Sequence, residues 1–371
     1  MSDVLVVGCG LLGASIGLAL RGSDLADVTL ADTDDVAVGV ATERGAGRRW
    51  DGEERASVVV VAVPPGVTAD VLTSLQRRNL AQTYTHVTSV QSHVQAEVER
   101  LSSDPSVVVG GHPLAGREVS GPRGALADLF VGRPWAVCAT DAAAPGAVDD
   151  VVRLATSCGA VPVRVGPAEH DAAVALLSHL PQVVSTALAA QLADRSGRSD
   201  LTLELSGPGL VDTTRLAASS PELWTEILAA NAGLVGPHLR AVAGDLDALA
   251  STLDTLSQSP GNEADRVRDA SLRDLEAFLR RGNLGRQQVP VKRGELAGAF
   301  AGVRVELDDE PGRLAGLLVA AGEAGVNVED IRVEHVPGRP RGVIELVVAP
   351  VAEGRLRAAL AVQGWHVFTS T

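Results

Sequence analysis

Short continuous apolar runs alternate with segments of helical spacing over residues 1–165. Runs of this kind are typical of parallel strands that helices cover on both faces. Ala14–Leu20 repeats its apolar residues at helical spacing soon after the first run. The pattern therefore predicts a doubly wound α/β domain. The runs that we expect to form strands are Asp3–Val7, Val28–Ala31, Ser57–Val63, Thr85–Val90 and Ser106–Val109.

The pattern changes to long helices over residues 166–284, which predicts an all-α domain. Ala168–Arg195 has apolar residues at three- and four-residue spacing, interrupted by Pro181. A proline inside a helix frees a carbonyl and bends the axis, so His179 and Gln182 beside it could both turn into a cleft. An equally good interpretation makes His179 a core histidine next to a structural bend.

A polar stretch, residues 285–300, has the composition of a linker, and residues 301–371 follow a third pattern. We expect a small α+β domain of βαββαβ order there. Its most distinct segments are the strand Val303–Leu307, the helix Arg313–Gly325 and the strands Val326–Ile331, Gly342–Val348 and Trp365–Thr369.

Charge and cysteine content narrow the class of protein. The 371 residues carry a formal net charge of −14, which argues against nucleic acid or an anionic membrane as a partner. Three scattered cysteines (Cys9, Cys138, Cys158) predict reduced thiols and no metal site. With neither a signal peptide nor a membrane span expected, the chain is predicted to be a soluble cytoplasmic protein that binds small molecules.

The first strand runs into a glycine-rich turn, Gly8-Cys9-Gly10-Leu11-Leu12-Gly13, and then into a helix. Such a turn brings a pyrophosphate to the helix N-terminus, and the carboxylate of Asp32 after the second strand favours NAD over NADP. The third strand leads into a loop that could cross the cofactor. We therefore expect a Rossmann domain that binds NAD through Gly8, Gly10, Leu11, Leu12, Gly13, Asp32, Val63 and Pro64.

His112 follows two glycines after an apolar run, at the strand edge where open α/β sheets place their chemistry. Ser89 is expected at the same edge, and a hydroxyl with an imidazole could handle a substrate hydroxyl during hydride transfer. The alternatives are a turn histidine at 112 and a helix cap at 89. The chain's one lysine, Lys292, lies outside the helical region, so no lysine there can accept the proton.

Arg215 lies among small and hydroxyl residues in the helical region, a setting that suits bidentate capture of a carboxylate. Asp212 is the alternative partner, in a purely structural ion pair. Ser220-Pro221-Glu222 predicts a helix start directly afterwards.

Taken together, these motifs resemble the prephenate/arogenate dehydrogenase family of tyrosine biosynthesis. The resemblance covers residues 4 to about 280 and rests most on two segments, Gly111–Gly116 around His112 and Asp212–Trp224 around Arg215. It implies NAD-dependent oxidative decarboxylation of prephenate to 4-hydroxyphenylpyruvate, with arogenate dehydrogenase as the close alternative. A tyrosine-sensing regulatory protein with an idle nucleotide domain is the alternative from another class.

The resemblance also implies a role for each candidate residue. His112 would accept a hydrogen bond, or the proton, from the substrate's ring hydroxyl, and Ser89 would orient both groups. Arg215 would bind a substrate carboxylate, with Ser219 and His179 close by.

The sequence departs from the family's pattern in two places. The acid and the lysine that usually flank the serine are absent around Ser89. Gln182 stands where the family often has a second histidine, close to the substrate side chain. Glutamine can serve a carboxylate or an ammonium group, so the choice between keto acid and amino acid stays open, with prephenate slightly favoured.

Residues 301–371 resemble an ACT domain, a small amino-acid-sensing fold. The resemblance rests on the turn before the predicted helix and on the segment around Asn327, and it implies a tyrosine effector near Asp309, Gly312 and Asn327. A domain that only dimerises is an equally good interpretation. The family's layout further implies a homodimer formed through the helical domain.

Overall fold

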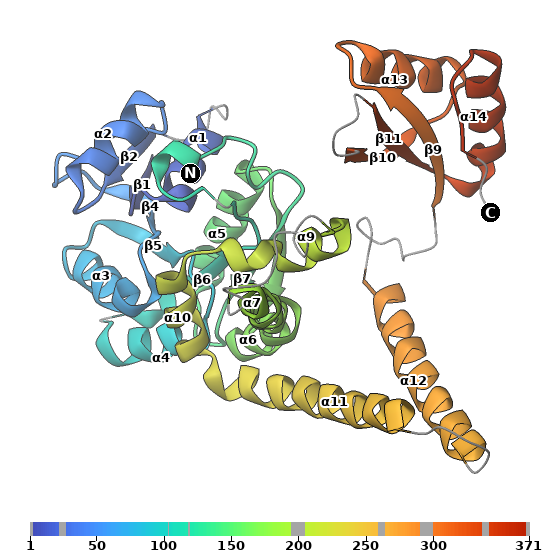
Figure 1. Cartoon of the computed structure of the whole chain (residues 1–371). Coiled ribbons are helices and arrows are strands. Elements are labelled where there is room, and N and C mark those ends of the chain that lie inside the picture. Colours follow the sequence, from blue (N-terminus) through green and yellow to red (C-terminus); the bar gives the residue numbers. More distant parts are fainter. Residues whose placement is uncertain are drawn as a thin grey trace. The chain divides into compact units, whose positions relative to one another are not determined.

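The computed structural model describes residues 3–21, 27–102, 104–117, 119–193, 205–258, 264–289, 300–335 and 341–368 (Figure 1). The chain divides into two compact units, Met1–Gly244 and Asp245–Thr371. The first unit holds the α/β domain and the residues of the candidate active site.

An eight-stranded sheet, in the order β3-β2-β1-β4-β5-β6-β7-β8, forms the centre of the first unit. All neighbouring strands are parallel except β6 and β7. The strands are β1 (Asp3–Val7), β2 (Asp27–Ala31), β3 (Arg48–Arg49), β4 (Ala56–Val61), β5 (Ala81–His86), β6 (Val108–Pro113), β7 (Pro134–Cys138) and β8 (Val161–Val165).

Successive side chains of the central strands pack on opposite faces of the sheet. Val4 and Val6 of β1 belong to one buried cluster, and Leu5 between them belongs to another. The first cluster includes residues of α1 (Leu11–Leu20), α2 (Asp35–Glu43) and α5 (Pro145–Ser157), the second residues of α3 (Pro65–Arg77) and α4 (Ser92–Leu101). Burial on both faces explains why these strands are continuous apolar runs, and the predicted Rossmann-like architecture is confirmed.

The predicted strand Thr85–Val90 is wrong in its position. The strand is β5, which ends at His86, and Val87–Gln91 form the connection to α4. Thr83 and Thr85 are buried in β5 although they are polar, so the strand is not marked by a continuous apolar run.

Helices follow the sheet, as predicted, and one of them is interrupted near Pro181. The interruption is a π-helical segment, η3 (Ala175–His179), between α6 (Pro167–Val174) and α7 (Leu180–Ala193). Proline has no N–H to donate to the preceding turn, which is consistent with a widened turn directly before it. Where the described part of the chain resumes at residue 205, the helical segments are α9 (Pro208–Thr214), η4 (Arg215–Ala218), α10 (Pro221–Ala230), α11 (Ala232–Gln258) and α12 (Ala264–Gln287).

The last of these helices is longer than the sequence suggests. We expect the linker to begin at residue 285, but α12 continues through Gly282 and Gly285 to Gln287. An ion pair between Arg280 and Glu276, one turn apart, supports the helix near these glycines. Residues 290–299 lie outside the described part of the chain. The boundaries predicted at residues 165 and 284 remain predictions.

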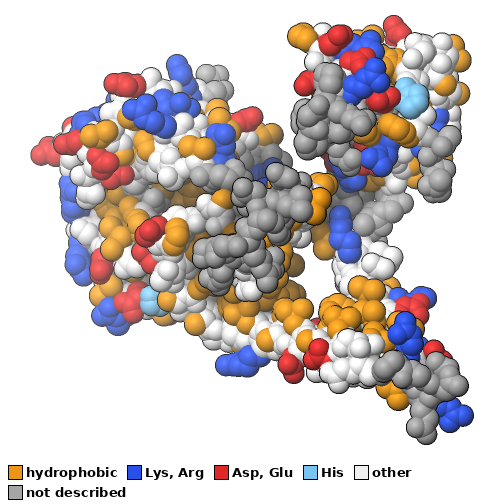
Figure 2. Space-filling model, viewed as in Figure 1, with side chains coloured by type: hydrophobic (Ala, Val, Ile, Leu, Met, Phe, Trp, Pro, Cys, Tyr) orange, Lys and Arg blue, Asp and Glu red, His pale blue; other side chains and the backbone are white. Residues whose placement is uncertain are grey.

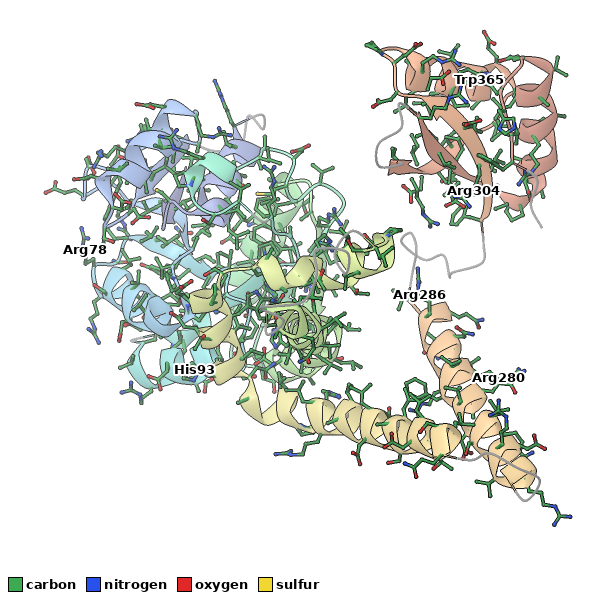
Figure 3. The ribbon with its side chains drawn as sticks, viewed as in Figure 1. Arg78, His93, Arg280, Arg286, Arg304 and Trp365 are labelled. Carbon is green, nitrogen blue, oxygen red and sulfur yellow. The ribbon has the colours of Figure 1, made fainter. Side chains whose placement is uncertain are left out.

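The C-terminal segment has its own buried core and a sheet of order β10-β11-β9. Its elements are β9 (Ala301–Asp308), α13 (Arg313–Glu323), β10 (Val328–His335), β11 (Arg341–Val348) and α14 (Pro350–Val362). Val367 forms an antiparallel bridge to Val305 of β9, where the last predicted strand was expected. Trp365, labelled in Figure 3, lies beside this bridge with the guanidinium of Arg313 5.1 Å from its ring centre.

By length and hydropathy alone, the helical stretch Pro167–Ala193 could cross a membrane. Core helices of globular proteins pass the same test. This stretch contains the buried polar side chains His170, Asp171 and His179, and the first two of these contact His112 and Gln91 of the α/β domain.

Candidate active site

Two glycines of the turn after β1 are required by packing within the protein. Gly8 has a φ of +103°, which L side chains rarely adopt, and a Cβ there would lie 2.4 Å from the carbonyl oxygen of Ala62. A Cβ on Gly13 would lie 1.9 Å from the carbonyl oxygen of Gly8. Because neither residue has a Cβ, α1 can pack directly against the strand ends.

Gly10 is different, because a Cβ at this position would meet nothing within 4 Å. It is the N-cap residue of α1, and its position gives the helix no side-chain cap. The backbone N–H groups of the first turn, which includes Leu11 and Leu12, are therefore available to an anion that approaches from outside. The open space at Gly10 fits the pyrophosphate of a dinucleotide.

The carboxylate of Asp32 lies beside the same turn. It follows β2 directly and accepts hydrogen bonds from the backbone N–H of Cys9, at 2.6 Å, and of Asp34, at 2.9 Å. Val63 also reaches the turn, with Cγ1 3.1 Å from the Cβ position of Gly8, and Pro64 is the N-cap residue of α3. The structure thus brings together the predicted dinucleotide residues at one edge of the sheet.

His112 lies at that same edge. The register pairs Val7 with Val61, Val61 with His86, and His86 with Gly110, two residues before His112. The chain does not turn at His112 as the alternative interpretation required: it is a residue of β6, paired with Ala136 of β7.

The two glycines before His112 serve close packing. A Cβ on Gly110 would lie 2.2 Å from the side-chain oxygen of Gln91, and one on Gly111 would lie 2.8 Å from the carbonyl oxygen of His86. Gln91 also donates from Nε2 to the Gly111 carbonyl, at 3.1 Å. The glycines therefore let β6 approach the segment between β5 and α4.

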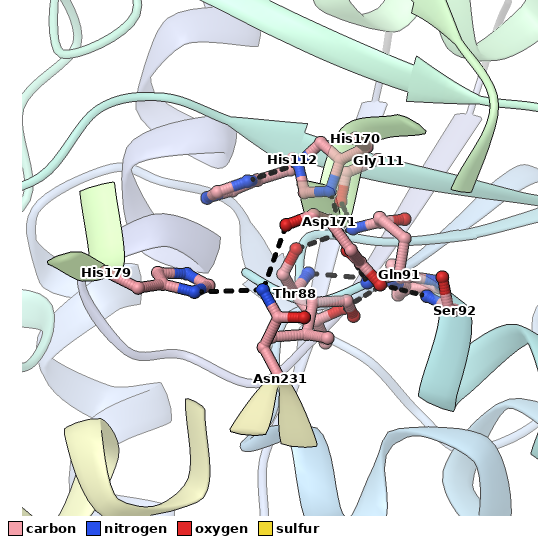
Figure 4. A network of polar contacts seen from close by, with 11 residues as sticks. Thr88, Gln91, Ser92, Gly111, His112, His170, Asp171, His179 and Asn231 are labelled. Atoms are coloured by element: carbon pink, nitrogen blue, oxygen red, sulfur yellow. Dashed lines mark hydrogen bonds and ion pairs between the residues drawn. The ribbon is translucent and has the colours of Figure 1, made fainter. Parts of the chain in front are cut away.

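The imidazole of His112 is buried and uncharged. Its exposed fraction is 9%, and burial, together with nearby His170 and His179, lowers its pKa to about 3. At neutral pH the ring therefore has one nitrogen free to accept a proton. Its Nδ1 lies 2.9 Å from Nε2 of His170 (Figure 4).

His170 and Asp171 complete a chain of contacts that we did not predict. Nδ1 of His170 lies 2.9 Å from Oδ1 of Asp171, and the Asp171 carboxylate accepts hydrogen bonds from the backbone N–H of Gln91 and of Ser92, each at 2.8 Å. Burial opposes ionisation of Asp171, but these hydrogen bonds outweigh it and hold the pKa of the carboxyl below its usual value. The signal in the sequence was an adjacent histidine and aspartate at the start of a helix.

Ser89 is half-buried in the connection between β5 and α4. The alternative that made it the cap of the following helix is wrong. The N-cap residue of α4 is Gln91, and the carboxylate of Asp171 accepts the hydrogen bonds there. Among the described residues, no hydrogen bond joins Ser89 to His112.

His179 belongs to the same buried network. Its Nδ1 lies 3.1 Å from Nδ2 of Asn231, which also donates to the backbone carbonyl of Asp171 at 3.0 Å (Figure 4). The ring meets Trp224 edge to face at 5.8 Å, and burial lowers its pKa to about 4. The π-helical segment thus turns His179 inward.

Gln182 and Ser219 converge on one backbone oxygen. The side-chain Nε2 of Gln182 and the hydroxyl of Ser219 donate to the carbonyl of Leu216, at 2.9 and 2.8 Å. Arg215 begins the same short helix and is exposed. Ser220 caps α10 through the N–H of Leu223, so the predicted helix start is confirmed.

The three proposed effector residues lie on the surface of the C-terminal segment. Gly312 has a left-handed conformation, with a φ of +87°, and precedes α13. Asp309 lies in the turn before it, and the amide of Asn327 contacts the carboxylate of Glu329. Within the described residues, no group of three or more His, Cys, Asp or Glu side chains could hold a metal ion.

Comparisons with known proteins match most of the chain. Residues 16–164 match the family model of the prephenate dehydrogenase nucleotide-binding domain, and residues 166–263 match that of the prephenate dehydrogenase dimerization domain. A "Probable prephenate dehydrogenase" from Streptomyces niveus is 37% identical over 94% of this chain and 95% of its own length. Prephenate dehydrogenase of Bacillus subtilis is 24% identical over 92% of this chain and 91% of its own.

Solved structures share the fold. Synechocystis arogenate dehydrogenase is 26% identical, with a TM-score of 0.57 over 74% of this chain and 99% of its own. The Aquifex aeolicus prephenate dehydrogenase solved with hydroxyphenyl propionate and NAD+ is 23% identical, with a TM-score of 0.64 over 76% of this chain and 98% of its own. The family matches, the S. niveus relative and the shared motifs agree: the chain belongs to the prephenate dehydrogenase family.

Proposed function

We propose that the protein catalyses the NAD-dependent oxidative decarboxylation of prephenate to 4-hydroxyphenylpyruvate. The observation that carries the proposal is a buried, uncharged His112 at the sheet edge that also presents the glycine turn. A neutral imidazole there can accept the proton of a substrate hydroxyl.

The residues divide the work by their chemistry. NAD held at the open turn around Gly10 would supply the hydride acceptor for the ring carbon that bears the hydroxyl. His112 would take the hydroxyl proton and return it to the phenolate oxygen once carbon dioxide has left and the ring is aromatic. Aromatisation supplies the driving force, so the protein mainly positions the groups and polarises the O–H bond. Arg215 would bind a substrate carboxylate, Ser89 would orient the hydroxyl, and Gln182, Ser219 and His179 would line the substrate side.

Arogenate is the second candidate substrate. The observation that favours it is Gln182, whose amide can serve either the keto acid or the amino acid side chain. The arogenate dehydrogenase of Synechocystis, at 26% identity, is also among the structures that share the fold.

We also propose a cytoplasmic homodimer with a tyrosine-binding ACT-like domain. The support for the dimer is the match to a dimerization domain, together with exposed apolar side chains on the helices that it covers. Figure 2 shows such side chains over α11, and further apolar side chains over α12, which lies beyond the matched residues. On η3 and α7 they are Leu176, Leu177, Val184 and Leu188. The support for the ACT-like domain is the β9-α13-β10-β11-α14 order.

The test is a spectrophotometric NADH assay with prephenate and arogenate side by side, each with and without tyrosine. We expect turnover of prephenate in the wild type and a loss on the order of 10²–10⁴-fold in kcat for His112→Asn, since a general base is removed. Arg215→Ala should raise KM for prephenate and leave NAD binding unchanged. If neither substrate turns over, the enzyme proposal is wrong and the regulatory alternative gains.

Tyrosine inhibition that Asn327→Ala abolishes would support the effector site. A full-length enzyme that ignores tyrosine would contradict it and favour a domain that only dimerises.

A further inference from the structure

We propose that His170 and Asp171 are positioning residues that hold His112 in the tautomer whose Nε2 accepts the substrate proton. The inference rests on the proposed function for the identity of the substrate, but the tautomer itself follows from the hydrogen-bond chain alone.

Asp171 sets which group donates and which accepts in the hydrogen bonds that link it to His170 and His112. Two of its contacts are backbone N–H groups, of Gln91 and Ser92, which can only donate. The carboxyl group is therefore an ionised acceptor, and its lowered pKa agrees. Because a carboxylate has no hydrogen to give, the ring nitrogen of His170 that faces it, Nδ1, must carry one.

The next link follows from the first. In its uncharged form, His170 carries its one hydrogen on Nδ1 and has a lone pair on Nε2, and this nitrogen lies 2.9 Å from Nδ1 of His112. Two lone pairs facing each other at this distance would repel, so Nδ1 of His112 must carry a hydrogen and donate it. Nε2 of His112 is then left with its lone pair.

His179, which belongs to the same network, has the opposite tautomer, with its hydrogen on Nε2. The side-chain amide of Asn231 points its NH₂ at the carbonyl oxygen of Asp171, which fixes the orientation of the amide. The same nitrogen lies 3.1 Å from Nδ1 of His179, so that nitrogen is an acceptor and Nε2 of His179 carries the hydrogen. The backbone and carboxylate of Asp171 thus help to set two histidines to opposite roles.

The arrangement also prepares the site for the charge that forms. When His112 takes a proton, its Nδ1–H still donates to His170, and the negative charge of Asp171 lies two hydrogen bonds away in a buried site. The titratable groups that act on His112 are His170, His179, Asp171 and His86, and Asp171 is the one anion among these four. Loss of this anion would weaken the base without touching the substrate.

Matched substitutions at position 170 test the proposal. In His170→Gln, the side-chain oxygen can accept the hydrogen of His112 Nδ1. In His170→Leu, the side chain has a similar volume but no hydrogen-bond acceptor. We expect kcat to fall about 10²-fold in His170→Leu and about tenfold or less in His170→Gln, with the Kd for NAD unchanged in both. His93→Asn, at an exposed histidine of α4 (Figure 3), is the control and should match the wild type.

The pH profile separates positioning from a merely structural role. Asp171→Asn should lower kcat and change the pH dependence of kcat, while saturating NAD still binds. Equal kcat in the two variants at position 170, or His170→Leu with the wild-type rate, would overturn the proposal.

Nitrogen-15 NMR of the histidine rings in the full-length wild type reads the tautomer directly and needs no turnover. Comparison with His112→Asn assigns the signal. We expect His112 to carry its hydrogen on Nδ1 at neutral pH, and a hydrogen on Nε2 would overturn the proposal. If neither prephenate nor arogenate is turned over, the proposed function fails, while this measurement still decides the tautomer.

Discussion

Three histidines of the site are buried in their neutral form, at positions 86, 112 and 179. Burial is the largest cause in each case and lowers the pKa to about 4, 3 and 4, respectively. A neutral imidazole is what a proton acceptor requires, so the same burial that suits His112 to its proposed role also makes the fold sensitive to acid.

This sensitivity has a definite sign. Between pH 6.5 and about 4, the unfolded histidines bind protons that the folded ones do not, so the free energy of unfolding falls as the pH is lowered. Each such histidine costs about 1.4 kcal/mol for each pH unit below its unfolded pKa. Urea unfolding at several pH values should show a lower midpoint at pH 5 than at pH 7.

The control for this prediction is again His93→Asn, because His93 is exposed. It should leave the pH dependence of the urea midpoint unchanged, whereas His86→Asn should reduce it. A midpoint that is constant between these pH values would show that the three histidines are not held neutral by the fold.

At the scale of elements, the turn between β1 and α1 combines two requirements in one short segment. Gly8 and Gly13 let the helix pack against the strand ends, while Gly10 faces open space. The first requirement concerns stability of the domain, and the second concerns what approaches the helix N-terminus.

Two alanine substitutions separate these requirements. Gly13→Ala should destabilise the protein by about 1–3 kcal/mol or more, because its Cβ meets the Gly8 carbonyl. Gly10 has an ordinary φ of −73°, and a Cβ there would have no close neighbour, so the melting temperature of Gly10→Ala should match that of the wild type. The Kd of Gly10→Ala for NAD should nevertheless rise about tenfold or more, because the methyl group fills the space through which the pyrophosphate would approach. Calorimetry measures this change. Unchanged NAD affinity in Gly10→Ala would place the cofactor elsewhere.

At the scale of the whole molecule, the helical segments η3 and α7 expose apolar side chains. Leu177 of η3 is 75% exposed, and Leu176, Val184 and Leu188 near it are also exposed. These side chains belong to the stretch that matches the dimerization domain. Burial against a second copy would stabilise the assembly through the hydrophobic effect.

A charged residue on this surface should therefore weaken the proposed dimer. We expect Leu177→Asp to shift the protein from dimer toward monomer in sedimentation experiments. If the side chain is central to the interface, the free energy of dimer dissociation should fall by about several kcal/mol. Val36→Asp is the matched control, because Val36 is 72% exposed on α2, outside the helical region. A wild-type protein that sediments as a monomer would contradict the proposed dimer.

The sequence by itself determined the features that depend on neighbours along the chain. The buried strands and the glycine turn follow from local patterns, as does Asp32 after β2, because strand and helix periods are written in adjacent residues. The family motifs around His112 and Arg215 were likewise sufficient to identify the family.

Tertiary structure alone decided how the candidate residues are set for chemistry. His112 and His170 lie 58 positions apart, and Asp171 meets the start of α4 from 80 positions away. No periodicity along the chain encodes such contacts, since they form only when α6 packs on the sheet edge beside α4. The π-helical turn that directs His179 inward and the glycines that fit β6 against Gln91 arise in the same way. The sequence supplied the imidazole, and packing between distant segments decided which of its nitrogens is free to act.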